Sequence, residues 1–239
     1  MKSLSIQNAG FLGSKITTVV PTFQDDFTSY ADTTAGDAAW PTSSTTKIRV
    51  NPTNDNIDFI WTAATANYGI AYDLTSVSDS AWILRFKIRF STLTSDTSWR
   101  AFLGLSSVNQ ATSPASITHK AIGMTLAYQN ADKSYGSLDA LNATLIQAPD
   151  NGQAWTPATS TDYYFEIKRL TTTTYRVEVF TNSDYSTGSV GQMAGSCSAS
   201  IIGLRYIKFV FRDDYTDTAN VTGTIDDVKF YNGITSVWV

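Results

Sequence analysis

The last apolar stretch of the sequence, Thr224-Ile-Asp-Asp-Val-Lys-Phe-Tyr-Asn-Gly233, breaks the alternation that a β-strand requires. Successive side chains of a strand point to opposite faces, so apolar residues that share a buried face recur at every second position. Val228 and Phe230 keep this spacing, but Ile225 lies in the opposite phase. Either a bulge interrupts the strand, or one carboxylate of the Asp-Asp pair points inward. A buried carboxylate would need a cation, an arginine or several N–H donors.

A matching acidic pair lies near the start of the chain, in Phe23-Gln-Asp-Asp-Phe27. On a strand, Asp25 would share a face with Phe23 and Phe27. Acid pairs at both ends of a β-rich chain predict that the first and last strands lie side by side.

The composition favours an all-β fold with a sizeable core. Apolar residues make up 42% of the 239 positions and aromatic residues 13%. Glutamate occurs only at Glu166 and Glu178, while β-branched and aromatic residues are abundant. The segment 31–40 can form a short helical turn capped by Asp32.

Short candidate strands separated by turn clusters predict a single β-sandwich or barrel. The clearest alternation places Arg85, Lys87 and Arg89 outward on a strand whose other face is apolar. The predicted strands are Lys47–Asn51, Ile57–Thr62, Tyr68–Leu74, Ala81–Phe90, Ala101–Ser106, Ile122–Tyr128, Ala143–Gln147, Tyr163–Leu170, Tyr175–Thr181, Leu204–Phe211 and Val221–Tyr231.

The closing GTIDDVKFYNG resembles the last strand of laminin-G-like, concanavalin A-like jelly rolls. The hairpin 162–180 resembles their central strands, and DDFTSYA followed by Trp40 resembles their start; the likeness spans residues 23 to 233. It implies two antiparallel sheets, often a structural Ca²⁺, and glycan or protein binding rather than catalysis. We therefore expect an N-terminal arm over residues 1–22 and one jelly-roll domain over residues 23–239.

Two kinds of site are expected from the residues and the resemblance together. The hard oxygen ligands that Ca²⁺ prefers are available at both chain ends, and the alternative is that these acids are exposed or pair with Arg205 or Lys229. Glycan sites combine exposed rings with amides and carboxylates, and rings are frequent in the presumed loops. The metal candidates are Asp25, Asp26, Asp226 and Asp227, and the glycan candidates are Trp99, Asn130, Asp132, Tyr135 and Trp155.

Catalysis is not expected. The Glu-x-Asp-x-x-Glu strand of glycosidases with this fold is absent, and the two glutamates are predicted to point outward and pair with Lys168 or Arg176. His119, the single histidine, falls in a presumed loop, and Cys197 is the single cysteine, so no intrachain disulfide forms. A glycan-degrading enzyme is the least favoured alternative.

The charge pattern and the N-terminus suggest a protein that works in an assembly. The net charge is −4 without a basic block, which argues against nucleic-acid binding. No apolar stretch reaches the length of a membrane helix, and the first residues lack the apolar core of a signal peptide. We expect residues 1–22 to dock onto another protein subunit, in a virion component or another extracellular surface protein that binds glycans. The alternative is a free-standing carbohydrate-binding module or lectin.

Overall fold

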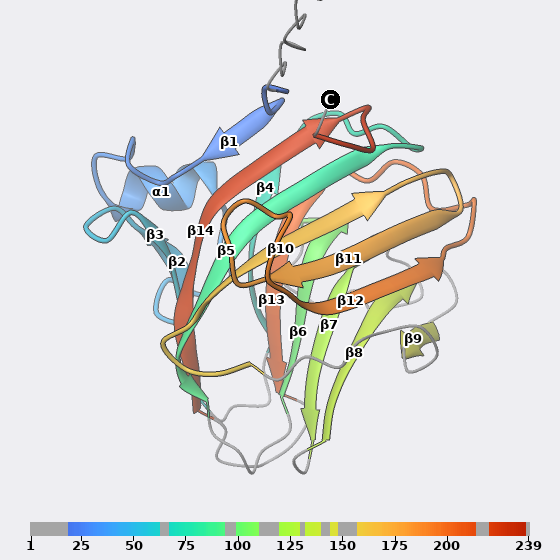
Figure 1. The fold of residues 1–239 in the computed structure, drawn as a ribbon. Helices are drawn as coiled ribbons and strands as arrows, with labels where there is room; N and C mark the ends of the chain where they lie inside the picture. The colour runs from blue at the N-terminus through green and yellow to red at the C-terminus, as the bar shows by residue number, and fades with distance from the viewer. Residues whose placement is uncertain are drawn as a thin grey trace, which may run out of the picture.

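Two antiparallel sheets face each other across one core (Figure 1). The computed structural model describes residues 19–62, 67–93, 99–109, 120–129, 132–139, 144–147, 157–213 and 220–237. Sheet A runs in the order β12 (Ser189–Ser196), β11 (Thr174–Phe180), β10 (Asp162–Arg169), β5 (Trp82–Leu93), β14 (Asn220–Asn232), β3 (Asn56–Thr62) and β2 (Ile48–Asn51), with β1 (Phe23–Asp25) also paired to β14. Sheet B runs in the order β4 (Asn67–Asp73), β13 (Tyr206–Asp213), β6 (Trp99–Ser106), β7 (Ala121–Gln129), β8 (Asp132–Asp139) and β9 (Thr144–Gln147).

These sheets confirm the predicted all-β sandwich, and each strand expected from alternation is present. Two further strands, β12 and β8, were not predicted. β12 is an edge strand whose sequence, Ser189-Val-Gly-Gln-Met-Ala-Gly-Ser196, has no apolar alternation. β8 reads as Asp132-Lys-Ser-Tyr-Gly-Ser-Leu-Asp139, which we had interpreted as a loop. In both cases pairing with a neighbouring strand prevails over weak local propensity.

Aromatic rings from both sheets hold the core together. The Phe86 ring stacks on Phe165 of the neighbouring strand, with ring centroids 5.1 Å apart, and meets Phe209 of sheet B edge-on at 5.1 Å. Trp40 and Trp82 are fully buried. Offset and edge-on pairs of this kind contribute beyond the area that they bury.

The phase slip in the last strand is a bulge. Opposite β5, the register of β14 shifts between Asp226 and Lys229, and Asp227 adopts a left-handed φ of 51°. The extra residue lets Ile225 and Val228 both reach the core, where both are fully buried. β1 pairs with the bulged end of β14, so the first and last strands do lie side by side (Figure 1).

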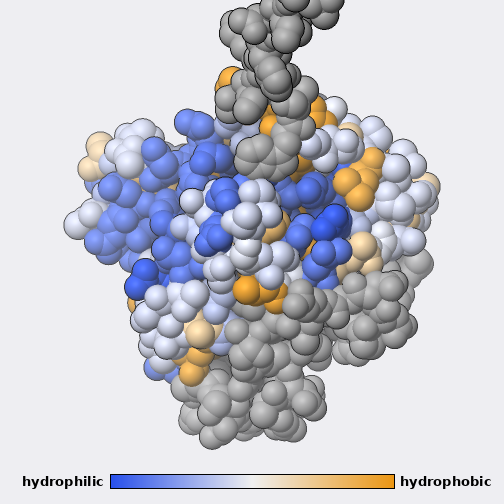
Figure 2. Space-filling view, viewed as in Figure 1, coloured by the Kyte–Doolittle hydropathy of each residue, from blue (hydrophilic) through white to orange (hydrophobic). Residues whose placement is uncertain are grey.

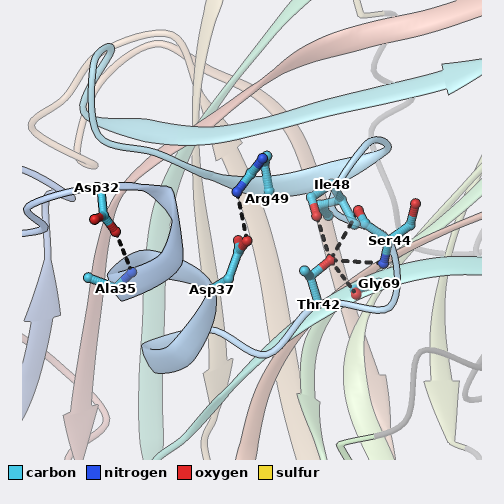
Figure 3. Close-up of polar contacts among 8 residues, drawn as sticks. All are labelled: Asp32, Ala35, Asp37, Thr42, Ser44, Ile48, Arg49 and Gly69. Atoms are coloured by element: carbon cyan, nitrogen blue, oxygen red, sulfur yellow. Dashed lines mark hydrogen bonds and ion pairs between the residues drawn. The ribbon is translucent and has the colours of Figure 1, made fainter.

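The short helix α1 (Thr33–Ala39) forms as its cap predicts. The Asp32 side chain accepts a hydrogen bond from the Ala35 amide at 2.9 Å (Figure 3). Gly36 lies directly against β2, since a Cβ added there would lie 2.6 Å from Val50. The helix therefore sits as close to the sheet as its backbone allows.

Polar contacts fix the segment after the helix. Arg49 of β2 donates to Asp37 of the helix at 2.8 Å, and the Thr42 hydroxyl donates to the Ile48 carbonyl at 2.5 Å (Figure 3). The Ser43 amide donates to the Gly69 carbonyl of β4 at 2.9 Å. This segment thus links one edge of sheet A to one edge of sheet B.

Candidate functional site

Asp25 is buried and fully engaged by protein donors. It accepts hydrogen bonds from the Phe27 amide at 2.8 Å, the Trp40 indole N–H at 2.8 Å and the Tyr30 hydroxyl at 2.5 Å. Burial, and next the hydrogen bond to Asp25, raise the pKa of Tyr30. The sequence correctly placed Asp25 on the face of Phe23 and Phe27, but its partners are N–H and O–H donors rather than a metal.

The other predicted metal ligands each have a different partner. Asp26 is exposed and accepts from the amide and hydroxyl of Thr28, which lower its pKa. On the bulge, Asp226 pairs with Lys87 at 2.6 Å and Asp227 pairs with Lys229 at 2.6 Å. Pairing with Lys229 was the alternative that the sequence left open.

These four acids do not fit one shared calcium ion. Among the residues that the structure describes, no group of three or more His, Cys, Asp or Glu side chains is arranged to hold a metal. Calcium would take six to eight oxygen ligands, whereas both oxygens of Asp25 already accept hydrogen bonds. The sequence-based assignment of Asp25, Asp26, Asp226 and Asp227 to one metal site is therefore corrected.

We expect chelation to leave the fold unaffected. A ligand that binds only the native state raises the melting temperature by mass action, so EDTA would lower it if calcium joined the chain ends. The expected change in a thermal melt with excess EDTA is within about 1 °C, because the contacts at the chain ends need no ion. A larger fall in melting temperature that added Ca²⁺ reverses would show that the chain ends do bind calcium.

The predicted glycan ligands fall mostly on strands. Trp99 is the first residue of β6, in register with Tyr128, and Asp132 begins β8. Tyr135 lies within β8, in register with Leu126 and through it with Ala101, a core position. Asn130 and Trp155 lie outside the described residues. Asp132 and Tyr135 are therefore strand positions rather than loop positions. Trp99 pairs with Tyr128 of β7, which pairs in turn with Lys133 of β8, so Trp99, Asp132 and Tyr135 lie toward the same end of sheet B, and their role in glycan binding stays a prediction.

Hydrophilic side chains gather on the outer face of sheet A (Figure 2), and several of them form ion pairs. Glu166, only 1% exposed, pairs with Arg85 of β5 and with Lys168 of its own strand. Glu178 lies directly opposite Glu166 and pairs with Arg176 at 2.9 Å. The predicted outward orientation of both glutamates is confirmed. Lys168 and Arg176 are the expected cations, but each pairs along its own strand rather than across the ladder, and the cross-strand partner of Glu166 is Arg85. Arg85 was expected to be solvated, but it is buried because a loop covers it.

That loop, residues 181–188 between β11 and β12, crosses in front of β5 and β10 (Figure 1). Its Tyr185 ring lies over the Arg85 guanidinium, 4.2 Å from the ring centroid. Asp184 accepts from the Ser186 amide and from the amide and hydroxyl of Thr187, and these bonds lower its pKa to about 2. The loop therefore seals the Glu166 ion pairs from solvent.

The outer face of sheet B is different, because small residues surround one buried lysine. Ile207, Phe209 and Phe211 of β13 point into the core, so the alternate residues Lys208 and Val210 lie on the outer face. In that face Val210 packs with Phe102 and Ala121 in a separate apolar cluster.

The strand neighbours of Lys208 have side chains no larger than a methyl group. Ala71 of β4 and Gly104 of β6 are its cross-strand partners, and Gly104 is paired in turn with Gly123 of β7. The Phe102 ring lies against both glycines: a Cβ at Gly123 would lie 2.8 Å from the ring and one at Gly104 would lie 3.1 Å from it. We call Ala71, Lys208, Gly104 and Gly123 the Lys208 row.

Within the described part of the chain, Lys208 differs from the other deeply buried cations in having no hydrogen-bond partner for its Nζ. Arg169 is also fully buried, but it donates to three carbonyl oxygens, at 2.7 to 3.1 Å. Arg85 pairs with Glu166. Among the residues that the structure describes, the Lys208 Nζ has no hydrogen-bond partner, and burial lowers the pKa of this amine to about 8. This burial was not predictable from the sequence, because a lysine that alternates with apolar residues on a strand is normally a solvated outward position.

We expect Lys208→Met to stabilise the protein at pH 7. Methionine keeps most of the side-chain volume and removes a buried charge. We expect the free energy of unfolding to rise by about 1–3 kcal/mol, and each kcal/mol should raise the melting temperature by roughly 2–4 °C. The native pKa of about 8 lies below the ordinary value of 10.5, so the unfolded state binds more protons between these values. Wild-type stability therefore rises with pH across this window, and the advantage of the variant shrinks. Thermal melts at pH 7 and pH 10 measure both effects; a gain independent of pH would contradict this explanation.

Similarity to known proteins appears at the level of structure. No protein-family model matches the sequence, and no curated protein matches it either. A putative β-glucanase from Mycobacterium abscessus superposes with a TM-score of 0.57 at 13% identity, over 88% of this chain and all of that one. The potassium-bound carbohydrate recognition domain of Emp46p superposes with a TM-score of 0.55 at 11% identity, over 87% and 95% of the two chains.

A sialidase also matches, with a TM-score of 0.54 at 11% identity over 90% of this chain. This chain spans only 19% of the sialidase's own length. The chain has the concanavalin A-like jelly-roll fold. Proteins that share it include carbohydrate recognition domains and glucanase-like proteins, and at these identities the likeness establishes the fold alone. No helix in the described part of the chain is long and apolar enough to cross a membrane.

Proposed function

We propose that this chain is a non-enzymatic carbohydrate-binding domain that serves as a surface or adhesion component of a larger assembly, with a virion as the favoured assembly. The fold supports the carbohydrate-binding part, since several proteins that share it are named as lectins or carbohydrate recognition domains.

The state of the two glutamates supports the absence of catalysis and is the observation that carries this proposal. Retaining glycosidases need two carboxyl groups about 5–5.5 Å apart and both open to the sugar. Glu166 and Glu178 are direct cross-strand partners, but cations engage both, and Glu166 is buried beneath the loop that carries Tyr185. A substrate could reach this pair only after the loop and the ion pairs were displaced.

Hydrolysis of glycans is the second candidate, and the facing glutamates are the observation that favours it. One experiment separates the two functions: binding of the purified protein to a panel of immobilised glycans, beside an assay for release of reducing ends. We expect binding without release. Release by the wild type that Glu178→Gln abolishes would establish an enzyme, and failure to bind any glycan would refute carbohydrate binding.

The assembly part of the proposal predicts that the N-terminal segment is an attachment point. The Thr22 amide donates to the Phe230 carbonyl at 2.8 Å, and the Thr22 hydroxyl accepts from the Asn232 amide, so a truncation should start at Val19 and spare these bonds. We expect the truncated protein to keep its melting temperature within about 2 °C, because no strand of either sheet is removed. It should no longer co-sediment with its particle. Full co-sedimentation would refute attachment through this segment, and unfolding would show that the segment belongs to the fold.

A further inference from the structure

Aromatic side chains of β1 and β4 meet on the side of the sandwich that carries α1 (Figure 1). The Phe23 ring of β1 stacks on Tyr72 of β4, with ring centroids 4.1 Å apart. Tyr72 also lies 5.1 Å from the ring of Trp40, and Tyr30 lies in the loop between β1 and α1. Phe23, Tyr30 and Tyr72 are partly exposed, whereas Trp40 is fully buried. We call Phe23, Tyr30 and Tyr72 the aromatic rim.

Buried contacts hold the aromatic rim in place. The Asp25 Oδ2 atom accepts from both the Tyr30 hydroxyl and the Trp40 indole N–H, at 2.5 and 2.8 Å. Trp40 in turn stacks on Phe209 of sheet B, with ring centroids 6.1 Å apart. Side chains that are already ordered lose little conformational entropy when a ligand binds. The rim is therefore preorganised.

The hydroxyl groups of the rim are able to form hydrogen bonds with a sugar. The Tyr30 hydroxyl donates its proton to Asp25, so its oxygen can accept from a sugar hydroxyl. Burial, and next the charges of Asp25 and Asp73, raise the pKa of Tyr72, so that this hydroxyl keeps its proton at neutral pH and can donate. Exposed ring surface beside fixed hydroxyls suits a pyranose, whose C–H groups pack on rings while its hydroxyls need polar partners.

The charge beside the rim favours neutral sugars. Asp25 is held by three neutral donors, which leave its negative charge uncompensated. Asp73, the other carboxylate near Tyr72, is paired with Arg205 at 2.6 Å and adds little net charge. An acidic group on a ligand would be repelled by Asp25, whereas a neutral sugar meets no such repulsion.

We propose that the aromatic rim binds a neutral glycan, with a pyranose ring against Phe23 and Tyr72 and a sugar hydroxyl donating to Tyr30; this inference rests on the proposed carbohydrate-binding function. The three side chains are partly exposed, so contact with a ligand requires no described element to move. Tyr72 is in register with the second residue of β13, and Trp99 with the last. The rim is therefore distinct from the glycan candidates named from the sequence.

A panel of neutral oligosaccharides and one matched pair test the class of ligand. The full chain is titrated at pH 7 with cellotetraose, laminaritetraose, mannotriose and N-acetyllactosamine. Tetragalacturonate and its methyl ester form the pair that differs in charge. We expect a neutral member of the panel to bind, and the free acid to bind no more tightly than its ester.

Variants of Tyr72 test the role of the rim. Tyr72→Leu keeps an apolar side chain against Trp40 but removes the ring, and it should weaken binding of the neutral ligand tenfold or more. Tyr72→Phe keeps the ring and should retain more of the affinity than Tyr72→Leu. Tyr164→Leu is the matched control, because Tyr164 is a partly exposed tyrosine on the outer face of sheet A, and it should change the affinity less than twofold. Circular dichroism confirms that each variant is folded, and Phe23→Leu provides the same test if Tyr72→Leu does not fold.

Each outcome has a distinct meaning. A folded Tyr72→Leu or Phe23→Leu that binds as tightly as the wild type overturns this inference while leaving carbohydrate binding intact. An equal loss in Tyr164→Leu, or tighter binding of the free acid than of its ester, does the same. Failure to bind every glycan overturns the proposed function and this inference together.

Discussion

Replacement of Asp25 by alanine should lower the stability of the domain by about 3–5 kcal/mol. The change leaves three donors without their acceptor: the Phe27 amide, the indole of the fully buried Trp40 and the Tyr30 hydroxyl. Each buried group left unsatisfied costs about 1–3 kcal/mol, and the partly exposed Tyr30 hydroxyl can recover a bond to water. In a domain of this size, the melting temperature should fall by roughly 6–20 °C.

Two further variants separate this explanation from a metal site. Asp26→Ala should change stability by less than about 1 kcal/mol, because the carboxylate is exposed and bonds only to nearby Thr28. Asp25→Asn should fall between wild type and Asp25→Ala, since one oxygen acceptor remains. The loss in Asp25→Ala should be the same with and without EDTA. A loss that disappears in EDTA would mean that a metal, rather than the three donors, holds this carboxylate.

The architecture was predictable from the sequence because long alternating strands carry a strong signal. Trp82, Leu84, Phe86, Ile88 and Phe90 alternate with cations, and all five are fully buried. The phase slip at Asp226 and Asp227 predicted a bulge as one of two readings, and the acid pairs at both ends predicted the pairing of β1 with β14. Such features depend on the two-residue period of a strand, which is visible in the order of apolar and polar residues along the sequence.

The partners of the charged side chains were harder to predict, because they depend on register and on tertiary packing. Asp25 was correctly identified as an inward carboxylate, yet its donors Tyr30 and Trp40 lie 5 and 15 residues away, and Trp40 follows the helix α1. A sequence pattern cannot distinguish these donors from a calcium ion. The error was to treat four acids as one group when each had a different neighbour.

The burial of Lys208 and Arg85 was also not predictable from the sequence. Both alternate with apolar residues, so both read as solvated outward positions. One is covered by a loop whose Tyr185 has a left-handed φ of 55°, and the other lies in a row of alanine and glycine. Burial on an outer face depends on what packs over the sheet, and alternation within one strand does not report it.

Replacement of Glu166 by glutamine should destabilise the domain by about 3–5 kcal/mol, the usual cost of breaking a buried ion pair from one side. Glutamine keeps the shape but removes the charge that Arg85 and Lys168 share. Arg85 would then be a buried cation without its carboxylate partner, with the rings of Tyr185 and Tyr231 beside its guanidinium at 4.2 and 5.9 Å from their centroids. Lys168 is less buried and can turn toward water.

The opposing glutamate provides the matched control. Glu178→Gln removes a partner of Arg176, which is about one-third exposed, so the expected loss is about 1 kcal/mol or less. Urea denaturation of both variants gives the two free energies of unfolding. Equal losses would mean that the loop over Arg85 does not seal the ion pair, and both glutamates would then be open to solvent and to a sugar. A large loss for Glu166→Gln alone would mean that Glu166 stabilises the fold, which is the role that a non-enzymatic domain requires of it.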